Sequence, residues 1–216
     1  MKLLLTLTLL SVSLLTNAQY DPTAKKHLDN LSKKLKSYST FKSKFKYHLD
    51  GPSDLDESYD GSIAIKGNKF HLKTNSGMEI ICDGMNICNY NVEDEEVTLY
   101  EYDESEDGIM TPTSVADMYK DGYRYKMSSS NDPSCHLIEL IPDLSPQERA
   151  KQPVTKIKLY IKKSDGMLKK WQIYERTGNK YTVTILSFTP NAALSSKEFL
   201  CHPSNFPSNV DFNDLR

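Results

Sequence analysis

The sequence lacks the short motifs that mark the common enzyme classes. It contains no Gly-rich nucleotide-binding loop, no His-Glu-x-x-His pair and no Gly-x-Ser-x-Gly elbow. The five histidines are scattered along the chain, whereas a metal site needs converging His, Cys and carboxylate ligands. We therefore expect no catalytic residues, no metal and no cofactor.

A strong net charge and long apolar runs are also missing. The 216 residues carry a formal net charge of −2, which gives no general attraction for nucleic acid. After the first residues, no stretch approaches the ~18 apolar residues of a membrane-spanning helix. Gly and Pro are not enriched, and no linker or internal repeat divides the chain. The composition therefore indicates one globular domain over 19–216.

The first 18 residues have the pattern of a signal peptide. Lys2 provides a positive start, an apolar run extends from Leu3 to Leu15, and small or polar residues end at Ala18. The run is short for a ~30 Å hydrocarbon core, which argues against a membrane anchor. No cysteine lies near the cleavage point, which argues against a lipid anchor. We expect cleavage after Ala18 and an exported, soluble, periplasmic protein.

One helix and many strands are predicted by hydrophobic periodicity. Leu28, Leu31, Leu35 and Tyr38 repeat with helical spacing, which predicts a helix over 23–38 with Thr23 as a plausible cap. After Ser39 the period changes to two. Eleven strands are predicted, at 41–49, 59–66, 69–74, 77–82, 86–90, 96–102, 122–127, 136–141, 154–162, 167–176 and 180–189.

Two short helices and one loop interrupt the strands. Thr111 and Pro112 are typical of a helix start, and Gly122 of a stop, which predicts a helix over 112–121. Another short helix is predicted from Ser195, with Glu198 in the capping-box position. Residues 142–153, with three prolines, are expected to form a loop, and the tail after 205 could add an extended piece.

These elements predict a mainly β (α+β) fold. A sheet of eleven strands must curl or split to bury one face, so we expect an unclosed antiparallel barrel. The N-terminal helix and the short helices would lie over its open side as a lid. Several strands carry large apolar residues on one face. Either these side chains fill an ordinary core, or the concavity keeps an apolar cavity that binds a hydrophobic ligand.

The cysteines Cys82, Cys88, Cys135 and Cys201 leave their redox state open. Export permits disulfides. If Asp83 and Gly84 are the two central residues of a turn, Cys82 faces Met85, and Cys82 and Cys88 point to opposite faces, which forbids a bridge between them. A three-residue loop would restore that pairing. Buried, reduced cysteines are the favoured interpretation.

Two charged tracts stand out. Residues 25–46 contain eight lysines and one acid, and residues 93–107 contain nine acids and no Lys or Arg. Both can be solvated faces. The lysine tract can also meet an anionic membrane or an acidic partner protein, at ~1 kcal/mol per lysine near an anionic surface.

Four segments, in their order and spacing, resemble the outer-membrane lipoprotein carrier protein (LolA) family. They are "LSKKLKSYSTFKSKF" (31–45), "GSIAIKGNKFHL" (61–72), "IICDGMNICNYNVEDEEVT" (80–98) and "TPTSVADMYKDG" (111–122), followed by an end similar to the family's closing pattern. Two family features are absent. The usual arginine in the turn after the second strand is replaced by Lys66-Gly67-Asn68-Lys69, and the usual tryptophan in the hairpin by Cys88.

The resemblance implies an unclosed eleven-stranded barrel that carries lipoproteins from the inner to the outer membrane by shielding their acyl chains. It implies cavity or lid positions for Leu31, Leu35, Phe45 and Phe70. With the apolar strand faces and the second helix, the expected acyl-chain site comprises Leu31, Leu35, Phe45, Ile63, Ile65, Phe70, Leu72, Val115 and Met118. The expected docking residues are Lys33, Lys34, Lys66 and Lys69, where Lys66 or Lys69 would replace the arginine.

The partners implied are lipoproteins as cargo, an inner-membrane lipoprotein-releasing transporter and a candidate outer-membrane receptor. We expect no nucleic acid and a monomeric chain. Two other functions stay open. One is a periplasmic carrier or sensor for another hydrophobic ligand, since half-barrels are reused for several functions. The other is a secreted hydrolase whose site has no known motif.

Overall fold

The computed structural model describes residues 20–103 and 109–216 of the chain. The expected signal peptide over 1–18 and its cleavage site lie outside these residues. In the part of the chain described, no helix is long and apolar enough to cross a membrane.

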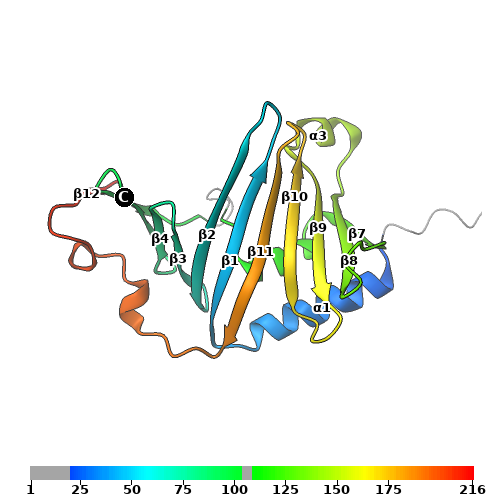
Figure 1. The fold of residues 1–216 in the computed structure, drawn as a ribbon, viewed down its shortest axis with the longest axis horizontal. Coiled ribbons are helices and arrows are strands. Elements are labelled where there is room, and N and C mark those ends of the chain that lie inside the picture. Colours follow the sequence, from blue (N-terminus) through cyan, green and yellow to red (C-terminus); the bar gives the residue numbers. More distant parts are fainter. Residues whose placement is uncertain (1–19, 104–108) are drawn as a thin grey trace, which may run out of the picture.

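Within these residues, twelve strands form one open sheet (Figure 1). Its order is β12-β6-β5-β4-β3-β2-β1-β11-β10-β9-β8-β7, and the two outermost strands do not pair with each other. The predicted unclosed barrel with an N-terminal helix is therefore confirmed. The strands are β1 Thr40–Asp50, β2 Asp56–Lys66, β3 Lys69–Thr74, β4 Met78–Cys82, β5 Asn86–Asn91, β6 Glu96–Glu101, β7 Tyr123–Ser128, β8 Cys135–Pro142, β9 Val154–Lys162, β10 Leu168–Glu175, β11 Lys180–Pro190 and β12 Asp211–Asp214.

The strand beyond the eleven predicted ones comes from the tail of the sequence. β12 pairs in parallel with β6, from Asp211 opposite Glu96 to Asp214 opposite Leu99. All other neighbouring strands are antiparallel. The short extended piece expected in the tail is thus an edge strand of the same sheet.

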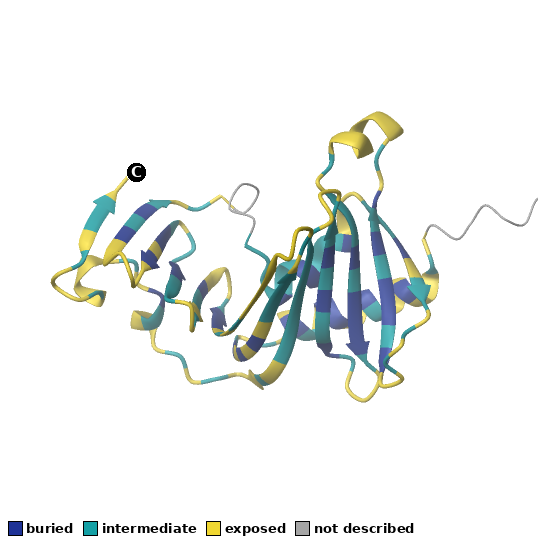
Figure 2. Ribbon diagram, turned by 45° about the horizontal axis from the view of Figure 1, so that its top comes forward, coloured by how far each residue is buried: buried dark blue, intermediate teal, exposed yellow. Residues whose placement is uncertain are grey.

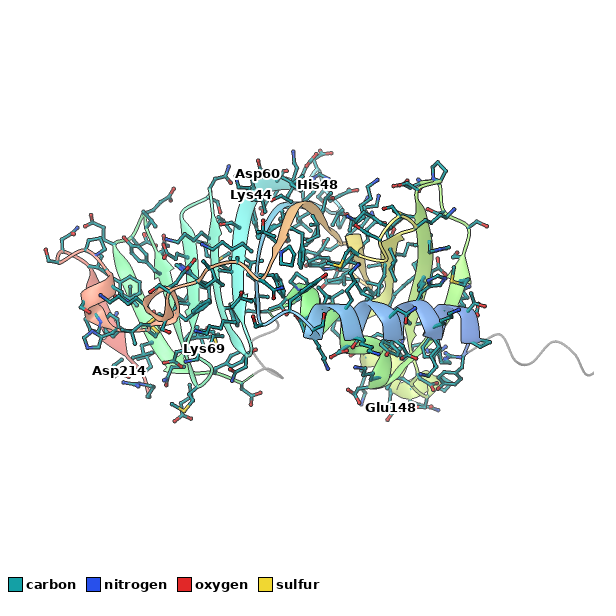
Figure 3. The ribbon with its side chains drawn as sticks, turned by 90° about the horizontal axis from the view of Figure 1, so that it is seen from below. Lys44, His48, Asp60, Lys69, Glu148 and Asp214 are labelled. Atoms are coloured by element: carbon teal, nitrogen blue, oxygen red, sulfur yellow. A yellow bond between two sulfur atoms is a disulfide. The ribbon has the colours of Figure 1, made fainter. Side chains whose placement is uncertain are left out.

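The helix α1 (Pro22–Lys36) packs on the inner face of β7–β11 (Figures 1 and 3). Its stripe of Leu28, Leu31 and Leu35 is at most 2% exposed. Burying one leucine side chain is worth about 1.5–3 kcal/mol. Packing of this face on the sheet therefore stabilises α1 more than the helical propensity of its residues does. The cap is Asp21, whose carboxylate accepts from the N–H groups of the first turn, and not Thr23 as predicted.

The other short helices agree with the sequence in part. α2 (Pro112–Asp117) begins after its predicted cap Thr111 and continues into the 3₁₀ helix η1 (Met118–Lys120). The predicted loop over 142–153 was partly wrong, because it contains α3 (Pro146–Lys151), which is stabilised by a capping box between Ser145 and Glu148. α3 buries no residue and stands exposed at one end of the sheet (Figure 2).

The segment after β11 crosses the outer face of β1–β6. It begins with the 3₁₀ helix η2 (Ser196–Phe199) and continues through η3 (Pro203–Asn205). Ser195 caps η2 as predicted, but Glu198 binds Lys42 of β1 at 2.9 Å and no capping box is present. Phe206 and Phe212 then cover the outer side of β4–β6, where they pack on Tyr90 and Val97.

A disulfide between Cys88 and Cys201 fixes this segment to β5. The expectation that all four cysteines stay reduced was therefore wrong for this pair, while Cys82 and Cys135 are buried outside it. The hairpin register explains the pairing. Cys82 lies opposite Ile87, so the connection is longer than the predicted two-residue turn, but Cys82 and Cys88 still point to opposite faces. Cys88 thus faces the tail, and Cys82 faces the inner core.

Candidate functional site

An apolar cavity of about 320 Å³ lies on the inner face where the two halves of the sheet meet. One wall comes from β1–β4 and the opposite wall from β9–β11, while Ile109, Met110 and Pro112 line it from the segment that leads into α2. Cavities of about 300–1,000 Å³ with mainly apolar walls are the usual binding sites for small molecules. This cavity is therefore the candidate functional site.

The structure separates the nine residues expected to bind acyl chains into two groups. Phe45, Ile63 and Leu72 line the cavity. The other six do not line it and are packed into the protein. Leu31, Leu35 and Val115 fill the interface between the helices and the sheet, with Met118 against them; Ile65 and Phe70 are at most 5% exposed in the core of β1–β6.

Most of the second wall was missed by the sequence analysis. It includes Trp171 and Ile173 of β10, and Tyr181, Val183 and Ile185 of β11. The alternation of apolar residues predicts both strands, but nothing in it indicates that these residues and those of the first strands line the same cavity. The sequence does not show how far the sheet curves, and in the structure β10 and β11 face β2 and β3 across the cavity.

Aromatic side chains form the middle of the cavity. Tyr47 of β1 and Tyr59 of β2 lie opposite each other in the register, and their rings stack with centroids 4.4 Å apart. Burial, with smaller contributions from Tyr59 and Tyr181, raises the pKa of Tyr47 to about 12. Its phenol therefore stays neutral at physiological pH, so this part of the wall is compatible with an apolar ligand.

A glycine makes room for one of these rings. Gly61 of β2 lies opposite Phe45 in the register. A Cβ at this position would lie 2.8 Å from the carbonyl oxygen of Lys73 and closer still to the Phe45 ring. The missing side chain thus lets the Phe45 ring lie against β2 and keeps this end of the cavity open.

A cluster around Asp117 holds the two lid helices together. Its carboxylate accepts from Ser32 of α1, lies 2.6 Å from Lys36 Nζ and also binds Lys120. Burial alone would raise the pKa of Asp117, but the hydrogen bonds from Lys120, Lys36 and Ser32 hold it below its usual range. The charged carboxylate is therefore favoured, and α1 is tied to α2 beside the cavity.

The lysines expected to dock partners are spread over separate elements. Lys33 is exposed on α1, and Lys34 Nζ donates to the carbonyl of Asp165 at 2.6 Å. Lys66 Nζ lies 3.4 Å from Ser196 Oγ on the outer segment, while Lys69 is exposed at the start of β3. Among described residues, neither Lys66 nor Lys69 bonds to α1 or α2. The suggestion that one of them replaces a lid-bound arginine is not supported by these contacts.

Within residues 20–103 and 109–216, no group of three or more His, Cys, Asp or Glu side chains is placed to bind a metal ion. The cavity wall itself contains one carboxylate, that of Glu175 at the end of β10. The arrangement thus provides apolar volume with few polar groups, which suits binding of a hydrophobic molecule.

Solved structures include proteins that are similar to this chain, and the first of them shares its fold. A crystal structure of an uncharacterized conserved protein from Thermus thermophilus has a TM-score of 0.57 with 10% identity, and the match covers 89% of this chain and 99% of that one. A LolA superfamily protein from Nitrosomonas europaea matches with a TM-score of 0.44 and 12% identity, over 82% of this chain and 97% of that one. No curated protein sequence matches the chain significantly.

The sequence profile described as "Outer membrane lipoprotein carrier protein LolA" matches residues 36–202. The match spans β1 to η2, and so includes both walls of the cavity and the disulfide. This chain therefore belongs to the LolA family of outer membrane lipoprotein carrier proteins.

Proposed function

We propose that this protein carries lipoproteins through the periplasm, from the inner to the outer membrane, with their acyl chains shielded in the cavity between β1–β4 and β9–β11. Proteins of its family are periplasmic carriers rather than enzymes. The observation that supports the proposal most directly is the apolar cavity of about 320 Å³ on the inner face. The signal peptide expected over 1–18 would deliver the chain to that compartment.

The energetics of an acyl chain set the steps of such a cycle. Burying a methylene is worth about 0.8 kcal/mol, so a chain of ~15 methylenes resists release into water by ~12 kcal/mol. Transfer from a bilayer into an apolar cavity is nearly neutral by the same reasoning. Loading therefore needs an energy-consuming transporter at the inner membrane, and delivery needs an apolar acceptor or a receptor at the outer membrane. The exposed lysines of α1, including Lys33, are candidates for docking such partners.

A charge placed in the cavity tests the proposal. Val183 lines the cavity, so Val183→Glu should abolish acyl-chain binding, because a carboxylate is costly to bury without a partner. Leu186→Glu on the same strand is the matched control, since Leu186 is 56% exposed. Native mass spectrometry of the purified proteins should find lipoprotein on the wild type and on the control only. Equal occupancy of the Val183→Glu protein would contradict the proposal.

A second function is favoured by the modest size of the cavity, which is near the lower end of the ~300–1,000 Å³ range for small-molecule sites. The protein would then be a periplasmic carrier or sensor for another hydrophobic ligand. The same mass spectra separate the two functions. Bound lipoprotein supports the first, and a free lipid or other small hydrophobic molecule supports the second.

A further inference from the structure

A polar groove of about 330 Å³ lies on the outer face of the sheet, opposite to the face that carries the apolar cavity. Strands β11, β1, β2 and β3 form its floor, and Glu198 of η2 adds to its lining. Figure 3 shows Lys44, one of the lining residues, on the side of the sheet away from α1. The other polar side chains of the lining include Lys42, Lys73, Ser62, Ser187 and Thr189. The proposed function leaves this groove without a role.

A row of outward side chains crosses four neighbouring strands at this groove. Phe45 packs in the inner core, so Lys44 before it points to the outer face. The register places Ser62 of β2 between Lys44 of β1 and Lys73 of β3. Ser187 of β11 lies on the other side of Lys44. From β3 to β11 the row therefore alternates between a lysine and a hydroxyl.

The row brings ammonium groups within reach of one anion. Neighbouring strands lie about 4.8 Å apart, so the backbones of Lys73 and Lys44 are about 10 Å apart, with Ser62 between them. Each ammonium is carried on a flexible four-carbon stem, so both can reach a group bound above Ser62. Lys42 lies two residues from Lys44, about 7 Å along β1, and can approach the same position.

These lysines keep free donors although two of them form ion pairs. Lys42 Nζ lies 2.9 Å from Glu198 Oε1, and Lys73 Nζ lies 2.9 Å from Glu79 Oε1. An ammonium group offers three donors, so one ion pair leaves further donors on each lysine. Within residues 20–103 and 109–216, the Lys44 ammonium forms no ion pair or hydrogen bond. The groove thus presents more donors than its own carboxylates use.

The charge and the donors of the groove favour an anion with several oxygens. Three lysines face the carboxylates of Glu198 and Glu79, and Glu79 also lies 2.6 Å from His71 Nε2, so one positive charge is left over. The three hydroxyls of the groove form no hydrogen bond inside the described part of the chain, so they can donate to a ligand. A phosphate monoester combines three terminal acceptor oxygens with a charge of about −1.5 to −2, whereas a carboxylate has two oxygens and one charge.

We propose that this groove binds the phosphate group of a phosphate monoester above Ser62, between Lys44 and Lys73. Lys42 and the hydroxyl of Ser187 complete the set of donors. Soluble phosphorylated molecules and the head group of phosphatidic acid both carry such a group, and the same charge-assisted hydrogen bonds bind it in either. The phosphate site lies on the opposite face from the apolar cavity and is independent of the proposed acyl-chain binding.

Two probes distinguish a soluble ligand from a lipid. Isothermal titration calorimetry measures the binding of glycerol phosphate, with glycerol as the uncharged control. Cosedimentation measures binding to phosphatidylcholine vesicles with and without phosphatidic acid. We expect the protein to bind glycerol phosphate, or the vesicles that contain phosphatidic acid, and the probe that binds identifies the source of the phosphate. The affinity should fall as salt is added, because the lysines are partly exposed.

Variants assign the binding to the groove. Lys44→Gln removes the uncompensated charge and should weaken phosphate binding about tenfold, because charge-assisted hydrogen bonds are the strong ones. Lys46→Gln is the matched control, since Lys46 is also exposed on β1 but does not line the groove, and it should change the affinity less than about twofold. Ser62→Asp places a carboxylate between Lys44 and Lys73 and should abolish binding. All three positions are exposed, so circular dichroism should show an unchanged fold.

Two results would overturn the phosphate site. One is the failure of both probes to bind the wild type. The other is an equal loss in Lys44→Gln and Lys46→Gln, since binding would then follow the general charge of β1. Neither result bears on acyl-chain binding, which native mass spectrometry of the Val183→Glu protein tests separately.

Discussion

The two halves of the sheet have similar apolar inner faces and cover them in different ways. On β7–β11, α1 presses Leu28, Leu31 and Leu35 into the sheet, and the interface is filled. On β1–β6, the buried inner cluster contains no helical residue in the part of the chain described. Figure 2 shows buried residues on the strands of both halves and on α1. The difference shows where a ligand has room: the cavity lies where the cover of α1 ends.

On its outer face, the β1–β6 half is covered by the segment after β11. Removing the disulfide that fixes this segment should have the largest effect on stability. The Cys88–Cys201 disulfide joins residues 113 apart and holds the outer segment on β5. Cys201→Ser should lower the free energy of unfolding by about 4 kcal/mol, because a long loop is no longer closed in the unfolded chain. Denaturant unfolding measures this loss. Cys135→Ala, which removes a buried thiol outside the disulfide, should cost about 1 kcal/mol; equal losses would show that the disulfide contributes little.

Replacing one leucine by alanine at each place compares the filled interface between α1 and the sheet with the wall of the cavity. Leu31→Ala should cost about 3 kcal/mol of stability, because Leu31 is fully buried on the face of α1 that packs on the sheet. Leu72→Ala should cost about 1 kcal/mol, because Leu72 already borders a cavity. Ligand affinity should respond in the opposite order, with Leu72→Ala giving the larger loss. If Leu31→Ala weakened binding more than Leu72→Ala, the ligand would have to reach beneath α1.

Adding a side chain at Gly61, next to the Phe45 ring, should leave less room for a ligand in the cavity. Gly61→Ala places a Cβ against the Phe45 ring, which lines the cavity, and 2.8 Å from the carbonyl oxygen of Lys73. We expect a loss of about 2 kcal/mol in stability from overpacking and a clear loss of ligand affinity. Ser62→Ala, at the exposed next position, is the control and should change neither. Unchanged affinity in Gly61→Ala would mean that Phe45 does not border the bound ligand.

The smallest effect concerns the pH dependence of the helix-covered half. His27 of α1 lies against His136 of β8, with ring centroids 4.1 Å apart and the ring planes tilted by 32°. Burial, then the neighbouring His136 and Lys26, lower the pKa of His27, and Asp21 opposes them. The unfolded chain therefore binds this proton more readily, so stability should fall as the pH drops below about 6.5 towards the folded-state pKa. Thermal unfolding from pH 7.5 to 5 should show this fall, and His27→Gln should reduce it.

Much of the fold could be predicted from the sequence because each element has a local cause. The stripe of Leu28, Leu31 and Leu35 specifies one helix, and the alternation after Ser39 specifies strands. The helix α3 was missed because three prolines indicated a loop, although the capping box of Ser145 and Glu148 favours a helix start. Local signals therefore determined the strands and the longer helix well.

The second wall of the cavity and the disulfide could not be predicted because they depend on contacts between distant residues. Cys88 and Cys201 meet only because the tail returns across the outer face, and nothing near either cysteine indicates that path. Likewise, Trp171 and Ile63 share the cavity only because the sheet curves. Ile65 and Phe70 have the same apolar character as the lining residues, yet they pack in the core of β1–β6.

Both edges of the open sheet are occupied by short pieces of chain. Along β7, the N–H of Asp21 donates to Tyr125 O at 3.1 Å, and its carboxylate accepts from the N–H of Met127 at 3.1 Å. Along β6, β12 adds four residues that begin and end with aspartates. Exposed edge strands invite pairing with other molecules, and short or charged edges discourage it. The unclosed barrel is thereby protected at both edges from strand-by-strand aggregation.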